Sequence, residues 1–427
     1  MTCSSRFLAL FVAVATPALL LAAESQSNWP TFRGAERTAV APDKGLLQKW
    51  PEGGPKLLWE AKGCGRGYAS LAIVGDKIFT LGDGLSAADD KDEYLYCCSR
   101  ADGKPLWKTK TGAPWTSGQP NWQSSRSTPT VDGDRVYVIT PHGLLFCCNA
   151  EKGDIVWKKD LKKDFDGKKG DGWGYSESPL IDGDRVIVTP GGSKDTMVAL
   201  NKMSGEPAWS ASVSGVQGAG HASIVISNVG GTKIYVQTTQ GKAMGVRAED
   251  GKLLWDYPIS ATAVIPTPIV KGDLALVIAG YGKGAALLKQ VPSGSEVKVE
   301  EVYPLTKELA NKHGGVVLLG DYIYGDSDDK GILYCAELKT GDIKWNKSRG
   351  AGGGSAAICA ADGCLYVRWQ NGVMGLVKAS PEKYEELGSF KIPGGNERPS
   401  WAHPVVLDGK LYLREQDKIL CYDVSAK

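Results

Sequence analysis

The sequence lacks an excess of charge of either sign. Its 427 residues include 50 lysines and arginines against 48 aspartates and glutamates, which leaves a net charge of +2 at pH 7. A protein that binds nucleic acid neutralises many phosphates and usually carries a basic excess. The balanced charge therefore argues against a nucleic-acid partner, and a hydrophobic fraction of 42% is typical of a soluble globular protein.

Long apolar runs are also scarce, and the one at the N-terminus is short for a membrane span. Residues 7–15 and 18–21 are apolar, but Thr16 and Pro17 separate them, and Arg6 precedes them. This order, followed by small residues, is that of a secretory signal peptide. We predict that residues 1–23 are a signal peptide and that the mature protein is periplasmic or secreted and not membrane-spanning. No cysteine follows in a lipobox position, so we expect no lipoprotein; the alternative is an uncleaved anchor.

The cysteines do not suggest a disulfide framework. There are ten, and Cys3 lies in the signal segment, which leaves an odd nine in the mature chain. An odd number already argues against full pairing. We expect most of them to be unpaired.

What the sequence does contain is a repeat, seen best from Ser125 to Leu161. Turn signals at Asp132-Gly133, Pro141-His142-Gly143 and Glu151-Lys152-Gly153 divide this stretch into four short segments with the character of strands. The four expected strands are Thr128 to Val131, Arg135 to Thr140, Leu144 to Asn149 and Ile155 to Leu161.

A Gly-x-x-x-Trp pattern marks the fourth strand of each unit. It occurs at Gly103/Trp107, Gly153/Trp157, Gly205/Trp209, Gly251/Trp255 and Gly341/Trp345. A four-stranded unit that recurs about every 45 residues predicts the blade of an all-β propeller. We expect the repeat tryptophans to pack between neighbouring blades in a structural role: Trp59, Trp107, Trp157, Trp209, Trp255 and Trp345.

The number of inner strands predicts eight antiparallel four-stranded blades. Their inner strands are expected to begin near Tyr68, Ser127, Ser176, His221, Ile265, His313, Ser355 and Trp401. Two fourth strands lack the tryptophan, at residues 297–302 and 387–392. The chain ends after three strands of the last blade, so we predict that the N-terminal strand with Trp59 completes that blade. This closure removes an open sheet edge. Residues 24–54 are then a lead-in segment, and residues 55–427 form the propeller.

The full pattern is Ser-x-x-Pro or Ser-Pro, Asp-Gly-Asp, a Val/Tyr strand and Asn-Ala-x-x-Gly-x-x-x-Trp, matched best by Ser127–Trp157 and Ser176–Trp209. It resembles the pyrroloquinoline-quinone (PQQ) repeat over roughly residues 55 to 427. The resemblance implies the eight-bladed fold shared by quinoprotein alcohol dehydrogenases and an outer-membrane assembly lipoprotein. Trp29-Pro30-x-Phe32-Arg33-Gly34 is similar to the lead-in of exported bacterial members. A WD-repeat propeller is the competing match, but most repeat tryptophans are not followed by Asp.

A quinoprotein dehydrogenase would need a sandwich around the cofactor, an oxygen-rich Ca²⁺ site and a carboxylate base. Cys97-Cys98 and Cys147-Cys148 resemble the vicinal disulfide of such enzymes, but both pairs fall inside a third strand, where adjacent side chains point to opposite faces. Cys97 aligns with Cys147, Ala199, Gly245 and Cys335, so we interpret the position as one that takes small residues.

Three acidic stretches are candidates for a Ca²⁺ site. They are Asp164 to Asp171, Asp326 to Asp329, and Asp83 to Glu93. None has the complete ligand spacing of a Ca²⁺ loop. We therefore expect solvated turns in each case and predict no metal site.

The segments that lead into the inner strands should line the mouth of the central channel. Loops on a rigid scaffold often carry function, so their unusual side chains are the candidate ligand- or partner-binding site. These are Arg66, Tyr68, Trp122, Arg126, Trp173, Tyr175, Glu177, His221, His313, Arg398, Trp401 and His403. The three histidines lie on the fourth, sixth and eighth blades, which argues against a shared metal. The alternative is an ordinary polar channel mouth.

These inferences favour an exported, non-catalytic binding or assembly scaffold of the cell envelope. Its expected partner is an envelope protein or a small ligand, and we expect a monomer. No cofactor and no catalytic residue are predicted. The alternatives are a PQQ-dependent dehydrogenase that oxidises an alcohol or sugar with the help of Ca²⁺, and an enzyme with an unrelated active site in the channel.

Overall fold

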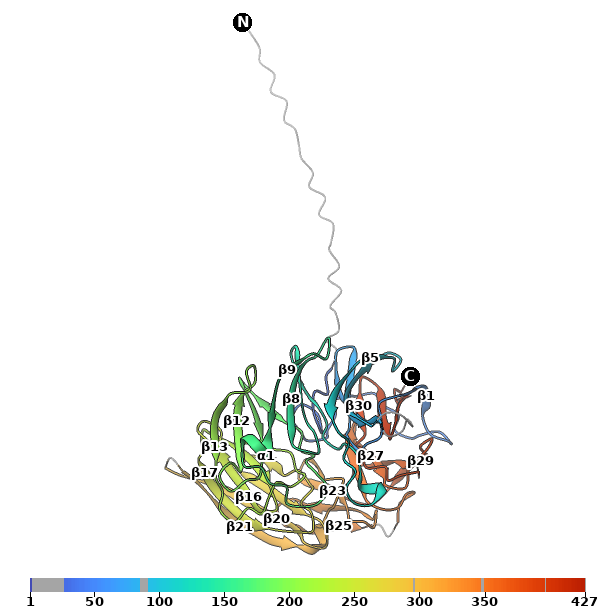
Figure 1. Ribbon diagram of the computed structural model, residues 1–427. Coiled ribbons are helices and arrows are strands. Elements are labelled where there is room, and N and C mark those ends of the chain that lie inside the picture. The colour runs from blue at the N-terminus through green and yellow to red at the C-terminus, as the bar shows by residue number, and fades with distance from the viewer. Residues whose placement is uncertain (2–26, 85–90, 295, 347–348, 396, 427) are drawn as a thin grey trace.

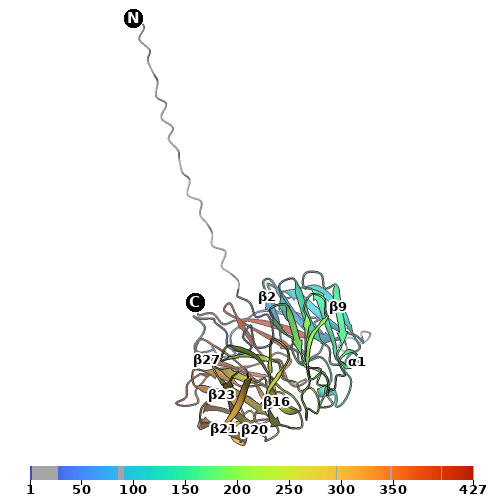
Figure 2. The same cartoon turned by 90° about the vertical axis from the view of Figure 1, so that its left-hand side faces the viewer.

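The computed structural model describes Met1 and residues 27–426 apart from 85–90, 295, 347–348 and 396. The predicted signal peptide therefore lies outside the described residues. Eight sheets, each of four strands, are arranged around one axis, and neighbouring blades follow one another in sequence order, as the colours in Figure 1 and Figure 2 show. The predicted all-β, eight-bladed propeller is confirmed.

The strands of each blade run outward from the axis in sequence order, with the exception of β1. The inner strands are β2 (Ala72–Val74), β6 (Thr130–Asp132), β10 (Leu180–Asp182), β14 (Val225–Val229), β18 (Ile269–Lys271), β22 (Val317–Leu319), β26 (Ala356–Ala361) and β30 (Val405–Leu407). The second strands are β3 (Lys77–Asp83), β7 (Arg135–Ile139), β11 (Arg185–Val188), β15 (Thr232–Thr238), β19 (Leu274–Ala279), β23 (Tyr322–Asp326), β27 (Cys364–Trp369) and β31 (Lys410–Glu415).

The remaining strands form the outer half of each blade. The third strands are β4 (Glu93–Ser99), β8 (Leu144–Asn149), β12 (Met197–Asn201), β16 (Gly241–Arg247), β20 (Gly284–Ser293), β24 (Leu333–Glu337), β28 (Val373–Lys378) and β32 (Lys418–Asp423). The outer strands are β5 (Pro105–Gly112), β9 (Ile155–Asp160), β13 (Pro207–Ala211), β17 (Leu253–Ile259), β21 (Glu296–Thr306), β25 (Ile343–Asn346), β29 (Glu386–Lys391) and β1 (Lys56–Lys62).

Among the residues that the structure describes, helical structure is limited to short pieces in the connections. These are α1 (Leu161–Asp164) and the 3₁₀ turns η2 (Pro120–Trp122) and η3 (Lys307–Leu309). No helix in the described part of the chain combines the length and the apolar character needed to cross a membrane.

The ring closes through the N-terminal strand, as predicted. Strand β1 pairs antiparallel with β32, with Trp59 opposite Cys421, and completes the sheet of β30, β31 and β32. In Figure 1 the blue β1 lies beside the red end of the chain. Because this pairing satisfies the backbone of β32, the last blade presents no additional sheet edge.

The repeat tryptophans pack between blades, and the repeat glycines make room for them. A β-carbon placed on Gly153 would lie 2.5 Å from Trp107 of the preceding blade, and one on Gly251 would lie 2.5 Å from Trp209. The Trp107 indole also donates a hydrogen bond to the Ala150 carbonyl of the next blade. Each Gly-x-x-x-Trp unit thus joins two blades, which explains why glycine and tryptophan recur together.

One of the two blades without the tryptophan uses another aromatic residue. Tyr303 on β21 lies 3.4 Å from the position of a β-carbon on Gly341, and its hydroxyl donates to the Leu338 carbonyl. A tyrosine therefore fills the position that an indole fills elsewhere. The sequence pattern located this strand but not its replacement aromatic.

Cys97, Cys147 and Cys335 occupy the small-residue position that the alignment of repeats predicted. Cys97 faces Trp107 across β4 and β5, and Cys147 faces Trp157 across β8 and β9. All nine cysteines from Cys64 to Cys421 are free and buried. They pack in the cores between strands, so the expectation of unpaired thiols is confirmed for these nine.

The lead-in segment crosses the propeller axis. Trp29 bridges to Ile73 of β2 in the first blade, and Val40 bridges to Ala360 of β26 in the seventh. Between these two points the Arg37 guanidinium donates to the carbonyls of Ser178 and Ile224 at 3.0 Å. The lead-in is therefore an integral part of the channel interior.

Candidate functional site

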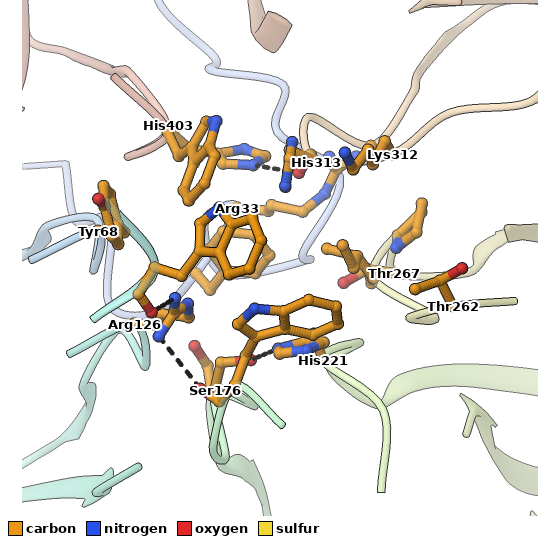
Figure 3. Close-up of a pocket in the computed structure, with 18 of the residues that line it drawn as sticks. Arg33, Tyr68, Arg126, Ser176, His221, Thr262, Thr267, Lys312, His313 and His403 are labelled. Carbon is orange, nitrogen blue, oxygen red and sulfur yellow. Dashed lines mark hydrogen bonds between the residues drawn. The ribbon is translucent and has the colours of Figure 1, made fainter. Parts of the chain in front are cut away.

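A cavity of about 330 Å³ lies on the axis, next to the lead-in. Seven blades each supply the residue four positions before the start of their inner strand: Tyr68, Arg126, Ser176, His221, Ile265, His313 and Trp401. Figure 3 shows these side chains converging from different blades. Because the repeat sets one such position per blade, the ring is a direct product of the fold.

The floor of the cavity is formed by Phe32, Arg33 and His403. Arg33 donates to the carbonyls of Arg37 and Val316, and His403 packs edge-on against Phe32 at a centroid distance of 4.7 Å. Arg33 is 3% exposed and His403 is 8% exposed, yet Nη1 of Arg33 and Nδ1 of His403 have no hydrogen-bond partner in the described structure. Buried polar atoms without a partner cost free energy, so this floor is suited to a polar ligand group.

The backbone of the lead-in, which supplies Phe32 and Arg33 to the floor, is also strained. Arg33, Arg37 and Ala39 have φ values of 66°, 55° and 58°, a region that residues other than glycine seldom adopt. Such conformations persist only where the surrounding contacts hold them, and they gather at functional sites. The surrounding contacts here are the hydrogen bonds from Arg33 and Arg37 to the blades.

Aromatic rings form the walls of the cavity. The ring of Trp401 stacks on His313 at a centroid distance of 4.4 Å and an angle of 25°, and it meets Tyr68 at 4.7 Å. Trp122 and Trp173 meet edge to face at 5.9 Å. Flat walls of this kind favour a planar ligand group.

Arg126 holds two of these walls in position. Its guanidinium donates to the carbonyls of Ser124, Trp173 and Trp122, and it lies 5.5 Å from the ring centre of Tyr68. Burial lowers the pKa of Arg126 to about 10, which leaves it charged at neutral pH. It therefore adds positive charge to the cavity without a carboxylate bound to it.

A second polar network runs along the wall at the third and fourth blades. His221 Nδ1 lies 2.5 Å from Ser176 Oγ, and His221 Nε2 lies 2.9 Å from Asp171 Oδ2. Lys169 Nζ reaches the same Asp171 oxygen at 2.7 Å. Burial lowers the pKa of His221 to about 4, against the opposing charge of Asp171, so the imidazole is neutral at pH 7.

Asp171 keeps its charge in this network. Burial alone would raise its pKa, but the hydrogen bond from His221 and the positive charge of Lys169 hold it well below the usual range. Burial also lowers the pKa of Lys169 to about 8. The expectation of a solvated turn at Asp171 is therefore wrong, because its side chain is 3% exposed and paired.

The other acidic stretches also differ from the expectation of solvated turns. Asp83, Glu93 and Asp326 are buried. Asp83 accepts two hydrogen bonds from Arg66, and Glu93 accepts one each from Thr111 and Ser125. Glu93 bonds across the junction between its blade and the segment leading into the next, whereas Asp83 bonds to the segment leading into its own blade, and these bonds explain why both carboxyls are buried. Residues 85–90 lie outside the described part.

Eight of the twelve candidate residues line the cavity, and four do not. Those that line it are Tyr68, Trp122, Arg126, Trp173, His221, His313, Trp401 and His403. The four others are held in the surrounding structure: Arg66, Tyr175, Glu177 and Arg398. Alternation explains two of them, since Tyr175 and Glu177 flank Ser176 and point away from the axis.

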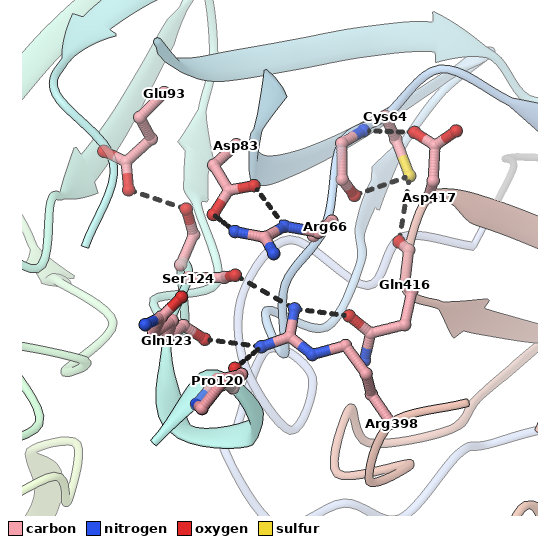
Figure 4. Close-up of polar contacts among 12 residues, drawn as sticks. Cys64, Arg66, Asp83, Glu93, Pro120, Gln123, Ser124, Arg398, Gln416 and Asp417 are labelled. Carbon is pink, nitrogen blue, oxygen red and sulfur yellow. Dashed lines mark hydrogen bonds and ion pairs between the residues drawn. The ribbon is translucent and has the colours of Figure 1, made fainter. Parts of the chain in front are cut away.

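Figure 4 shows where the other two residues, Arg66 and Arg398, lie. Arg66 pairs with the buried Asp83 at 2.9 Å. Arg398 donates to the Ser124 hydroxyl and to Gln416 Oε1, and lies 5.4 Å from the ring centre of Tyr68. Both support the cavity from behind and are not lining residues.

Several lining residues were not predicted from the sequence. They are Phe32 and Arg33 of the lead-in motif, together with Ser176, Tyr281 and Lys312. Ser176 and Lys312 occupy or adjoin the same repeat position as Arg126 and His221. Aligning the blades at that position was the signal that could have found them.

The donor set does not fit Ca²⁺. Among the described residues that line the cavity there is no aspartate or glutamate, whereas Ca²⁺ takes six to eight oxygen ligands with several carboxylates. The cationic groups Arg33, Arg126 and Lys312 line the cavity instead. In the part of the chain that the structure describes, no group of three or more His, Cys, Asp or Glu could hold a metal ion.

These features define an eight-bladed propeller with an aromatic and cationic axial cavity. The family model described as outer membrane protein assembly factor BamB matches residues 91–347, more than half of the chain. The chain belongs to this family of PQQ-like propellers. No curated protein sequence matches it.

Solved structures share the fold at low sequence identity. BamB from Moraxella catarrhalis has a TM-score of 0.59 at 16% identity, with 86% of this chain and 97% of that chain covered. The quinohemoprotein alcohol dehydrogenase from Comamonas testosteroni has a TM-score of 0.62 at 11% identity, with 94% and 81% covered. A europium-containing methanol dehydrogenase has a TM-score of 0.62 at 12% identity, with 92% and 89% covered. Assembly factors and dehydrogenases thus share the fold of this chain.

Proposed function

We propose that this protein is an exported binding or assembly scaffold of the cell envelope, whose axial cavity receives an organic anion with a flat ring. The observation that carries the proposal is the unpartnered Nη1 of Arg33 on the cavity floor. A buried guanidinium nitrogen without a partner is costly, and an anion would satisfy it with a charge-assisted hydrogen bond. The anion is a free small ligand or an acidic group on an envelope partner.

The surroundings of Arg33 support this ligand class. Arg126 and Lys312 line the same cavity, and no described lining residue is acidic. The stacked rings of Trp401 and His313 offer a flat wall. A ring bound against that wall would direct its charged group to the floor, where Arg33 lies.

Export and an envelope partner are supported by the family. The family description names an outer membrane protein assembly factor, and the N-terminal residues have the order of a signal peptide. Mass spectrometry of envelope fractions tests the location, with a mature N-terminus near Glu24 as the expected result. Intact Met1 on cytoplasmic protein would contradict export.

Calorimetry with matched pairs of ligands tests the cavity. Benzoate, naphthoate and indole carboxylates are compared with their neutral amides, and the carboxylates are expected to bind more tightly. The Arg33→Gln variant should lose about 10- to 100-fold in affinity, since a hydrogen bond to a charged group contributes about 1.5–3 kcal/mol. Arg247→Gln removes an arginine paired with Asp250 in an outer turn and should change nothing. Equal binding of acids and amides would refute the proposal.

The quinoprotein alternative is favoured by the structural neighbours and disfavoured by the donor set. PQQ is itself a flat anion and belongs to the proposed ligand class, but the lining offers no carboxylate for Ca²⁺ or for a base. We therefore expect no dye-linked oxidation of alcohols or sugars with added PQQ and Ca²⁺. Turnover that requires the quinone and is lost in Trp401→Ala would establish the dehydrogenase instead.

A further inference from the structure

The network at Ser176 has the connectivity of a nucleophile, a base and an orienting acid. Ser176 Oγ lies 2.5 Å from His221 Nδ1, and His221 Nε2 lies 2.9 Å from Asp171 Oδ2. Two chain segments meet here: the connection leading into β10, which carries Asp171 and Ser176, and the segment leading into β14, which carries His221. Figure 3 shows Ser176 and His221 joined at the cavity wall.

The direction of the hydrogen bonds follows from the acid. Asp171 is an ionised carboxylate and can only accept, so the proton of the neutral imidazole lies on Nε2. Nδ1 of His221 is then free to accept the hydroxyl proton of Ser176. Asp171 is held in turn by Lys169 and by the backbone N–H of Trp173 at 3.0 Å. The base is thus fixed in the tautomer that proton abstraction from serine requires.

The hydroxyl is also placed where a reactant can reach it. Ser176 lines the axial cavity of about 330 Å³, whereas the side chains of His221 and Asp171 are only 7% and 3% exposed. Arg126, whose guanidinium stays charged at neutral pH, lines the same cavity and supplies positive charge for an oxyanion, whereas the Lys312 ammonium is paired with Asp329. A serine presented to a cavity, with a nearly buried base that lines the same cavity and an acid buried behind the base, is the arrangement of nucleophilic catalysis.

We propose that Ser176 is the nucleophile of an acyl-transfer site that hydrolyses carboxylic esters with a flat acyl group. Ser176 Oγ attacks the carbonyl carbon while its proton passes to His221 Nδ1. The ester C–O bond breaks, and the leaving alcohol takes that proton. Water then attacks the acyl carbon and gives one proton to His221, and the Ser176 Oγ–carbon bond breaks as the serine regains it. The balance is ester and water to carboxylic acid and alcohol.

The structure provides a matched control within the same ring. Ser355 Oγ lies 2.8 Å from His313 Nδ1, but Ser355 is buried and is not a lining residue of the cavity. The acid nearest to His313 is Asp329, at 3.9 Å from the same Nδ1 atom and too far for a hydrogen bond. This pair has a serine and a histidine but neither the acid nor the access, so it should not react.

A fluorophosphonate probe tests the proposal on the full mature chain, because such probes form a bond with an activated serine whatever the natural ester is. We expect one label per chain, mapped to Ser176 by peptide mass spectrometry, and no label in Ser176→Ala. His221→Asn should react about 10²- to 10⁴-fold more slowly, the share that a general base supplies. Ser355→Ala should react like the wild type.

A second readout does not depend on the probe. With p-nitrophenyl esters, the wild type should release a burst of about one equivalent of p-nitrophenol per chain through acylation of Ser176. Thermal melting of each variant shows whether it is folded. Labelling at another residue, no labelling of the folded wild type, or an unchanged rate in folded His221→Asn would each overturn the proposal. These outcomes are separate from the anion-binding test, which rests on Arg33.

Discussion

Gly153 in the turn before β9 lies flat against the indole ring of Trp107 on β5, in the neighbouring blade. A β-carbon on Gly153 would come within 2.5 Å of Cε3 of Trp107 and of the Thr109 hydroxyl. Gly153 also has a φ of 78°, which residues with a side chain seldom adopt. The contact joins two blades through a residue with no side chain.

Substituting Gly153 with alanine is expected to destabilise the protein by about 2–4 kcal/mol, the sum of backbone strain and displacement of the indole. Gly133→Ala is the matched control, because Gly133 has a φ of 56° but nothing within 4 Å of a β-carbon. Gly133→Ala should lower the free energy of unfolding only by the backbone strain, about 1 kcal/mol. Urea unfolding of both variants measures the difference, and equal losses would show that the contact with Trp107 does not matter.

Arg37→Gln tests whether the lead-in stabilises the channel. The guanidinium donates to the carbonyls of Ser178, Ile224 and Pro179, and it is buried. Loss of these bonds leaves carbonyls unpaired, so we expect a destabilisation of about 3 kcal/mol. Arg247→Gln should stay within about 0.5 kcal/mol of the wild type. A wild-type melting temperature in Arg37→Gln would mean that the lead-in is dispensable.

The stability of the protein should decrease as the pH rises through neutrality towards 8. Burial raises the pKa of Glu177 and of Glu93 to about 8, whereas an unfolded glutamate titrates near 4.5. Above pH 4.5 the unfolded chain has lost these protons and the folded chain keeps them, so stability decreases as the pH rises towards 8.

Buried histidines act in the opposite direction below pH 6.5. Burial lowers the pKa of His221 to about 4 and that of His403 to about 3, so acidification favours the unfolded chain. Between pH 6.5 and 8 each of these glutamates lowers the stability by at most about 1.4 kcal/mol per pH unit, and Lys169, whose pKa burial lowers to about 8, opposes this decline near the upper end of the range. Glu177→Gln should therefore make this decline shallower, as measured by urea unfolding at several pH values. An unchanged slope would show that Glu177 is ionised in the folded protein.

Thiol titration gives a further check on the fold. The nine cysteines from Cys64 to Cys421 are free and buried, and burial raises the pKa of the Cys97 thiol to about 12. The folded mature protein should react with an aromatic disulfide reagent about 100-fold more slowly than the denatured chain. Denatured, non-reduced protein should show nine reactive thiols. A count that is lower by pairs would reveal disulfides formed after folding.

The blade architecture could be predicted from the sequence, because each blade repeats the same local pattern. The tryptophan, the small residue opposite it and the glycine of the next blade recur at nearly fixed intervals, so each unit confirms the others. The last blade was predicted for a similar reason: Trp59 has the outer-strand pattern but no inner strands before it. Local periodicity carried this information.

The site was harder to predict from the sequence, because its residues come from irregular segments. Asp171 lies in a loop with no repeat, and its partners Ser176 and His221 come from different blades. Arg33 lies outside the repeats altogether. Tyr175, Ser176 and Glu177 illustrate the limit within the repeats, since only the middle residue faces the cavity. The sequence therefore located the ring of segments but not which side chains face inward.

The pairing of Trp59 with Cys421 sets an order of events during synthesis. Strand β1 is among the first described elements to be made, and β32 is the last. β1 cannot find its permanent neighbours until the whole chain has been translated, because contacts so distant in sequence form late and slowly. The outer strand of the eighth blade must therefore wait, with the backbone hydrogen-bonding groups of β1 unpaired, until β32 has been made.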